Sequence, residues 1–117
     1  MHQVYLPEHF IRQLKSYRKK YRHFEEDLVR TLENFQPELS DRLGNKLYKV
    51  RMKSRDLPRG KSKSFRIIIF LIEIKKLVVP LTLYFKGDQQ DVSGKEIEYH
   101  LQIVLEEIQK NKIKVIR

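Results

Sequence analysis

The side-chain pattern changes from a helical period to a period of two at Leu47, and this change constrains the fold more than any other feature of the chain. In the segment "LYKVRMK" the cationic side chains of Lys49, Arg51 and Lys53 alternate with apolar ones. Successive side chains of a β-strand point to opposite faces of its sheet. The segment therefore predicts a strand with an apolar inner face and a cationic outer face.

Two further strands are expected after this one. The segment "FRIIIFLIEI", residues 65–74, is β-branched and aromatic, and it predicts a strand buried on much of both faces. The segment "LVVPLTLYFK", residues 77–86, predicts the next strand, joined to it by a tight turn near Lys75 and Lys76. Because Pro80 has no N–H to donate to a neighbouring strand, we expect a bulge or a locally unpaired site there.

Helices are expected before and after the strands. Pro7 suits a first helical turn, and apolar residues follow it at helical spacing as far as Tyr21. Residues 25–35 predict a second amphipathic helix, and the short link makes the pair a helical hairpin. Ser93 followed by Glu96 is a capping-box pattern that predicts the start of a last helix.

This order of elements predicts an α+β fold: an N-terminal helical hairpin packed on a three- to four-stranded antiparallel sheet with a C-terminal helix. All the helices are expected on one face, which leaves the cationic face open. The length suits a single domain over residues 1–117. Residues 110–117 are expected as a flexible tail or a short strand, and residues 2–6 are a candidate edge strand.

The positive charge is concentrated in one part of the chain. The net charge is +10, yet residues 1–45 carry eight Lys/Arg against seven Asp/Glu, and residues 67–117 carry the same numbers. Residues 46–66 carry nine against one. A local cationic patch on a balanced protein is typical of a polyanion site, most often for nucleic acid. The alternative is a solvated, charged strand and loop.

Several chemistries are disfavoured by the residues present. The chain has no cysteine, and its four histidines are not spaced as metal ligands, so we expect no metal and no cofactor. The segment "PRGKSKS" lacks the glycines of a nucleotide-binding phosphate loop. The longest apolar run is too short to cross a bilayer, and no signal-peptide core precedes it. We expect a soluble, cytoplasmic protein without a membrane partner.

The same segments resemble a known family. The run "LYKVRMK", the basic loop, "GKSKSFRIIIF", the apolar hairpin, and "LTLYFK" followed by "DVSGKEI" are similar to the RelE/ParE superfamily of toxins from bacterial type II toxin–antitoxin systems. The segment "LKSYRKKYRHFEEDL" resembles the N-terminal helical hairpin of the RelE branch. The resemblance covers residues 5–108. It implies an endoribonuclease, an mRNA interferase, that cuts mRNA on the ribosome and that a cognate antitoxin holds inactive.

The resemblance also implies roles for the cations. Lys49, Arg51 and Lys53 match the strand cations of the family, and Arg66 matches the arginine of the following strand. Because crowded cations lower one another's pKa, we expect Lys49 to be a general base for the attacking 2′-hydroxyl. Arginine keeps its proton, so it suits a phosphate clamp. The expected catalytic residues are Lys49, Arg51, Arg66 and Lys86, and the expected substrate-binding residues are Lys53, Arg55, Lys61 and Lys63.

The general acid and the function class both stay open at this point. Some members of the family carry an arginine and then a tyrosine after the third strand, whereas this chain has Lys86 followed by Gly87 and has Ser93 where the tyrosine is expected. The candidates for the acid are Lys86, Tyr84, Tyr99 and His100. The other functions in view are a ParE-like inhibitor of DNA gyrase, a non-catalytic RNA-binding module, and an inactive or structural protein.

Overall fold

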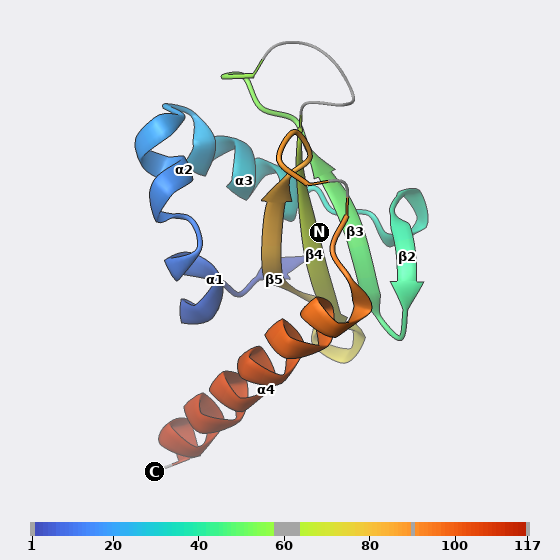
Figure 1. The fold of residues 1–117 in the computed structure, drawn as a ribbon. Helices are drawn as coiled ribbons and strands as arrows, with labels where there is room; N and C mark the ends of the chain where they lie inside the picture. Colours follow the sequence, from blue (N-terminus) through green and yellow to red (C-terminus); the bar gives the residue numbers. More distant parts are fainter. Residues whose placement is uncertain (1, 58–63, 90, 117) are drawn as a thin grey trace.

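The structure is a computed structural model that describes residues 2–57, 64–89 and 91–116. These residues form a five-stranded sheet with the strand order β1-β5-β4-β3-β2 (Figure 1). All neighbouring strands are antiparallel except β1, which is parallel to β5. The strands are β1 (Gln3–Val4), β2 (Asp41–Gly44), β3 (Leu47–Met52), β4 (Phe65–Ile72) and β5 (Leu77–Phe85).

The helices confirm the predicted α+β class, although their bounds differ from the expected ones. The predicted first helix is two short helices separated at Gln13 and Leu14, and the final helix continues through the segment expected as a tail or a strand. The helices are α1 (Glu8–Arg12), α2 (Lys15–Lys20), α3 (Phe24–Glu33) and α4 (Gly94–Ile116), with 3-10 turns η1 (Pro37–Leu39) and η2 (Glu73–Lys75). Ser93 Oγ accepts a hydrogen bond from the backbone N–H of Glu96 at 3.1 Å, as the capping-box pattern predicts.

The expectation that all helices lie on one face of the sheet is wrong. Alternate residues of β4 belong to two separate cores. Ile67 and Ile69 pack in the core that also contains Leu28 of α3, whereas Ile68 packs with Val104 of α4. The three N-terminal helices therefore cover one face, and α4 crosses part of the other (Figure 1). The apolar side chains of α4 are buried against the apolar end of the same sheet face that carries the cations.

The sheet also has more strands than the three or four expected. The candidate edge strand at residues 2–6 is confirmed as β1, which pairs with β5. The other edge strand, β2, was not predicted, because all four of its residues are exposed and show no apolar alternation. It pairs with β3 through Asp41 opposite Lys49.

Pro80 lies at a bulge in β5, as predicted. Ile69 pairs with Pro80 while Ile68 pairs with Thr82, so Leu81 is the extra residue. The amide of Gln13 binds this edge, with Nε2 donating to the Leu81 carbonyl at 3.1 Å and Oε1 accepting from Thr82 Oγ1 at 2.6 Å. The break between α1 and α2 therefore supplies the side chain that satisfies the polar groups of the bulge.

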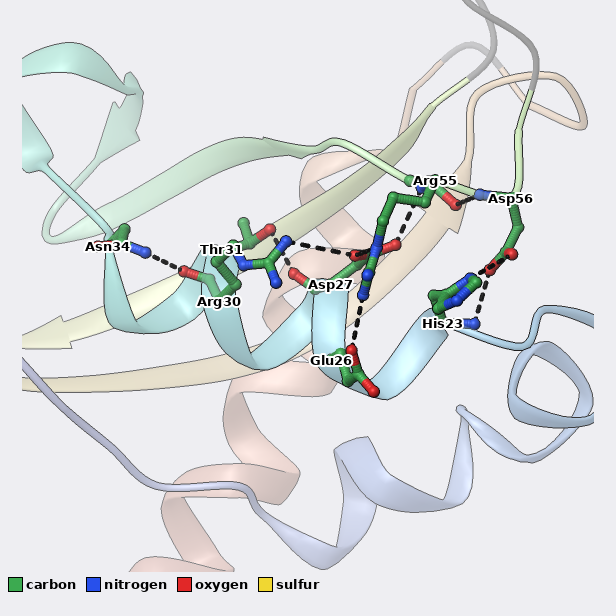
Figure 2. A network of polar contacts seen from close by, with 9 residues as sticks. His23, Glu26, Asp27, Arg30, Thr31, Asn34, Arg55 and Asp56 are labelled. Atoms are coloured by element: carbon green, nitrogen blue, oxygen red, sulfur yellow. Dashed lines mark hydrogen bonds and ion pairs between the residues drawn. The ribbon is translucent and has the colours of Figure 1, made fainter.

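Arg55 and Asp56 tie the chain that follows β3 to α3 (Figure 2). Asp27, only 3% exposed, accepts from the Arg55 backbone N–H at 3.0 Å and from Arg55 Nε at 2.9 Å. Arg55 Nη2 also donates to Glu26 at 2.8 Å. Asp56 accepts from the backbone N–H of His23 at 2.8 Å, at the start of α3. The Arg55 guanidinium, expected to bind substrate, is thus engaged in ion pairs with Asp27 and Glu26 that join this segment to α3.

A second polar seam joins α1 to α4, and it pairs two of the histidines. His9 Nε2 lies 2.7 Å from His100 Nδ1. Next to them, the Glu107 carboxylate accepts from Tyr5 Oη and the Glu8 N–H at 2.9 Å each, and from the His9 N–H at 3.2 Å. The pKa of each histidine is lowered, mainly by burial, and the pKa of His100 is lowered further by the charge of His9.

We expect Asp27→Asn to destabilise the fold by about 2 kcal/mol, the scale of a hydrogen bond to a charged group. Both carboxylate oxygens of Asp27 accept from Arg55, so an amide would turn an NH₂ toward an N–H donor. Urea unfolding would measure the change. Glu26→Gln is the matched control: it alters the exposed contact to the same Arg55 and should leave the unfolding midpoint unchanged. Equal midpoints for the two variants would contradict the structural role of Asp27.

The α1–α4 seam predicts a dependence of stability on pH. Because the folded pKa values of His9 and His100 are lowered, the unfolded chain binds more protons below about pH 6.5. The seam's contribution is full above that pH and is lost as the pH falls through the folded values. The facing charges are Arg12 on α1, and Glu96 and Glu107 on α4.

The thermal unfolding midpoint should therefore fall between pH 7 and pH 5. His100→Asn should reduce proton uptake on unfolding, which flattens this slope. His2→Asn, next to the Phe35 ring and away from the seam, is the control and should keep the wild-type slope. The same slope in His100→Asn as in the wild type would show that the pair does not titrate as described.

Candidate active site

The register of the three central strands brings the predicted cations onto one face of the sheet. Arg51 on β3 pairs directly with Arg66 on β4, which pairs in turn with Tyr84 on β5. Directly paired residues of antiparallel strands point to the same face. Lys49 precedes Arg51 by two residues and shares that face. Three of the four expected catalytic residues therefore lie together, with Tyr84 beside them.

Arg66 carries its charge in a largely desolvated position. The residue is 9% exposed, and its Nη1 donates to Ser64 Oγ. Burial first, and then the charge of Arg51, lower the pKa of the guanidinium. The unperturbed value for arginine is so high that the group remains protonated. Because Arg51 opposite it is exposed, an anion arriving from solvent would meet one accessible and one buried guanidinium.

Lys49 differs from the sequence-based expectation. Its side chain is 19% exposed, and its Nζ lies 3.0 Å from Asp91 Oδ1. The hydrogen bond that Lys49 donates to Asp91 raises the pKa of the Lys49 amine, against the opposing effect of burial. The expectation that neighbouring cations lower this pKa is therefore wrong. At neutral pH Lys49 is therefore an ammonium ion, which carries a positive charge and donates hydrogen bonds but has no lone pair to accept a proton.

Asp91 is the residue of this site that the sequence analysis missed. Its Oδ1 accepts from Lys49 Nζ, from Tyr84 Oη at 3.3 Å and from the Val92 N–H at 2.8 Å. These hydrogen bonds, with that of the Val92 N–H first, lower the pKa of the carboxyl group. In the sequence Asp91 reads as a turn residue before a helix cap. No local pattern links it to Lys49, which lies 42 positions earlier.

The four candidates for the general acid separate into two groups. Tyr84 lies in the site, 5% exposed, and burial raises the pKa of its hydroxyl. Lys86 lies just past the end of β5, and its backbone N–H donates to the Ser64 carbonyl at 2.9 Å. Tyr99 and His100 belong to α4 and contact His9, on the side of α4 that meets α1. Tyr84 is therefore the candidate on the same face as the cations, and Lys86 stays a candidate next to the end of the same strand.

The four expected substrate-binding residues lie in different surroundings. Lys53 is exposed just past the end of β3, where it and Arg51 line a groove against α3. Arg55 is held by Asp27, as described above. Lys61 and Lys63 lie outside the residues that the structure describes.

A second basic surface lies on α2. Residues 12–22 contain six Lys/Arg and no acid. The net charge of residues 1–45 is nevertheless close to zero, because acids elsewhere in this range, among them Glu25, Glu26 and Asp27, balance the cations. Arg18 pairs with Glu25. A shorter counting window would have revealed this run. The exposed cations on or next to the helix are Arg12, Lys15, Arg18, Lys19, Lys20 and Arg22.

Two negative findings apply to the described part of the chain. No group of three or more His, Asp or Glu side chains there is arranged to hold a metal ion. None of the helices in that part is both long and apolar enough to cross a membrane.

No protein-family model and no curated protein sequence matches the chain. Among solved structures, it is similar to three Escherichia coli structures that contain the toxin RelE. The first is the intact RelBE toxin–antitoxin complex, with a TM-score of 0.45 and 17% identity over 71% of this chain and 94% of the other. The second is an arginine double mutant of RelE in the free state, with a TM-score of 0.46 and 21% identity over 76% and 87%. The third is the isolated RelE toxin, with a TM-score of 0.45 and 19% identity over 88% and 99%.

Proposed function

We propose that the protein is a RelE-like toxin, a metal-independent endoribonuclease that cleaves mRNA on the ribosome and so inhibits translation. The observation that carries the proposal is the gathering of Lys49, Arg51 and Arg66 with Tyr84 on one face of the sheet. Three cations and a hydroxyl donor at neighbouring positions suit a phosphodiester whose charge increases during reaction.

The proposed reaction needs no metal. The 2′-hydroxyl of the RNA attacks the adjacent phosphorus, the O2′–P bond forms and the P–O5′ bond breaks. The products are a 2′,3′-cyclic phosphate and a free 5′-hydroxyl. The guanidinium groups of Arg51 and Arg66 stabilise the crowded anionic transition state, and the burial of Arg66 fixes its position before substrate arrives.

Lys49 has a different role in this proposal from the one expected from the sequence. Because the amine is paired with Asp91 and stays protonated, it stabilises phosphate charge together with the arginines. Tyr84 and Lys86 are the candidates to protonate the leaving oxygen. The pKa of Asp91 is lowered and that of Tyr84 is raised, so neither suits a base near neutral pH. The proton of the 2′-hydroxyl passes to solvent water as the O2′–P bond forms, and the ribosome orients this hydroxyl for attack.

The basic surface of α2 supports the ribosomal part of the proposal. Its cations are exposed on a helix and separate from the strand cations. Contacts to phosphates position a protein on structured RNA without reading its sequence. We assign α2 to docking on ribosomal RNA and the strand cations to the reaction.

Partner and location follow from the same proposal. E. coli RelE is bound to its antitoxin in the RelBE complex, and this chain is proposed to have a cognate antitoxin of its own. Such a partner would mask the uncovered cations of the sheet. Ribosomes and mRNA place the proposed activity in the cytoplasm.

Purified protein added to a cell-free translation reaction should arrest translation and cut mRNA, as primer extension of the mRNA ends would detect. Arg51→Ala should slow single-turnover cleavage by about 10²-fold, the scale for loss of one positioned charge donor. Arg51 is exposed, so its loss should leave the fold intact. Efficient cutting of RNA without ribosomes would contradict the proposal. Gyrase-dependent DNA breaks with intact mRNA would instead support a ParE-like activity.

Two matched variants separate the surfaces in the same assay. Lys75→Ala, in the turn between β4 and β5, removes an equal charge elsewhere and should change nothing. Lys19→Ala on α2 should weaken ribosome binding and lower its dependence on salt by about one ion, with an unchanged single-turnover rate. A slower chemical step in Lys19→Ala would argue against a purely docking role for α2.

Lys49→Arg tests whether the residue acts as a base or as a charge. An arginine keeps the positive charge and cannot give up its proton, so the variant should retain activity to within about tenfold. Lys49→Met removes the charge and should lose about 10²-fold. Single-turnover rates on programmed ribosomes would measure both. Equal, severe losses in the two variants would restore the role of general base.

A further inference from the structure

We propose that Asp91 is a positioning residue of this site, which holds the ammonium group of Lys49 beside the Tyr84 hydroxyl. The inference rests on the proposed function, because the purpose of the contact is phosphate chemistry. Asp91 belongs to the segment between β5 and α4. Neither the sequence of β3 nor the residues next to Asp91 in the sequence indicate this role.

The contacts converge on one oxygen atom. Asp91 Oδ1 accepts from Lys49 Nζ on β3 at 3.0 Å and from Tyr84 Oη on β5 at 3.3 Å. Lys49 and Tyr84 come from strands that are separated by β4, so the carboxylate spans the strand that carries Arg66. A single acceptor therefore fixes the relative positions of two donors that the sheet alone does not bring into contact.

The carboxylate is itself held in place from its own segment. The N–H of Val92 donates to Asp91 Oδ1 at 2.8 Å, and the side chain of Val92 is 8% exposed in the core under α4. Gln89 Nε2 donates to the Asp91 carbonyl at 2.8 Å, and Ser93 caps the helix that follows. Anchored on both sides, Asp91 acts as a fixed acceptor in the way that outer partners orient the ligands of metal sites.

The charge of Asp91 has a use even at a site that binds an anion, because it acts on the neighbouring Lys49. Asp91, through its hydrogen bond and its charge, and Asp41, which pairs with Lys49 from β2, favour the proton on Lys49, whereas burial disfavours it. Lys49, Arg51 and Arg66 therefore share one face of the sheet with a carboxylate that offsets part of their mutual repulsion. An ammonium group has three N–H donors, so the bond to Asp91 leaves two for a phosphate oxygen. The acid therefore supports the charge of Lys49 without using up its donors.

Asp91→Asn tests the link directly, with Asp88→Asn as its matched control. Both variants remove one negative charge from the same segment, but among the described residues Asp88 forms neither a hydrogen bond nor an ion pair with Lys49. NMR titration of ¹³C-labelled lysine, with the Lys49 resonance assigned from Lys49→Arg, measures the amine in the free protein. We expect the pKa of Lys49 to fall in Asp91→Asn, because its hydrogen-bond acceptor loses its charge, and to stay unchanged in Asp88→Asn.

The second readout is cleavage on programmed ribosomes. Single-turnover cleavage should slow about tenfold in Asp91→Asn, comparable with the loss of an orienting partner at a metal site, and Asp88→Asn should cleave like the wild type. Binding of an mRNA with a 2′-deoxy nucleotide at the cleavage position should not weaken in either variant, because no cation is lost. Circular dichroism melting confirms that both variants are folded.

The two readouts separate the inference from the function on which it rests. Cleavage by Asp91→Asn at the wild-type rate or faster would overturn the positioning role, and so would an unshifted Lys49 pKa. A wild-type protein that cuts no mRNA on ribosomes would overturn the proposed function, and with it the catalytic purpose of the contact. In that case the Lys49 titration would still report whether Asp91 controls the charge of Lys49.

Discussion

The burial of β4 on both faces is the constraint on which the rest of the structure depends. Ile67 and Ile69 are fully buried under the N-terminal helices, and Ile68 is fully buried under α4. Each such side chain contributes about 1.5–3 kcal/mol when it leaves water, so neither face of the strand can be left uncovered. Two helical layers follow from this strand. Arg66, near the beginning of the same strand, is also buried, with 9% of its surface exposed.

The position of α4 decides the limits of the candidate site. Its apolar side chains cover one end of the face, through contacts with Ile68, Val79 and Leu81, and the cations occupy the other end. The segment that leads into α4 then has to pass over the site. Val92 enters the core, and the adjacent Asp91 is carried onto Lys49 and Tyr84. The packing of α4 on the sheet thus limits the extent of the cation cluster and also brings Asp91 next to it.

The site and the scaffold use their charges in different ways. Arg55 is bound to Asp27, an acid that is itself buried, so its charge maintains the contact between β3 and α3. Arg51 is exposed on the sheet opposite Arg66, where its charge is available to an incoming anion. Both arginines belong to the same basic stretch of sequence, and the alternation of the strand ends before Arg55. Past the end of β3, Arg55 pairs with the acids of α3, the neighbouring helix.

The sequence by itself determined the elements whose signal is local. The alternation in "LYKVRMK" indicated β3 and its cationic face, the apolar runs indicated β4 and β5, and Pro80 indicated the bulge. Only the tertiary structure decided that α4 crosses the cationic face, that Asp27 takes Arg55, and that Asp91 raises the pKa of Lys49. The physical reason is range. Backbone period and proline chemistry act between neighbours in the chain, whereas burial and ion pairing depend on residues that only the folded sheet brings within a few ångströms of one another.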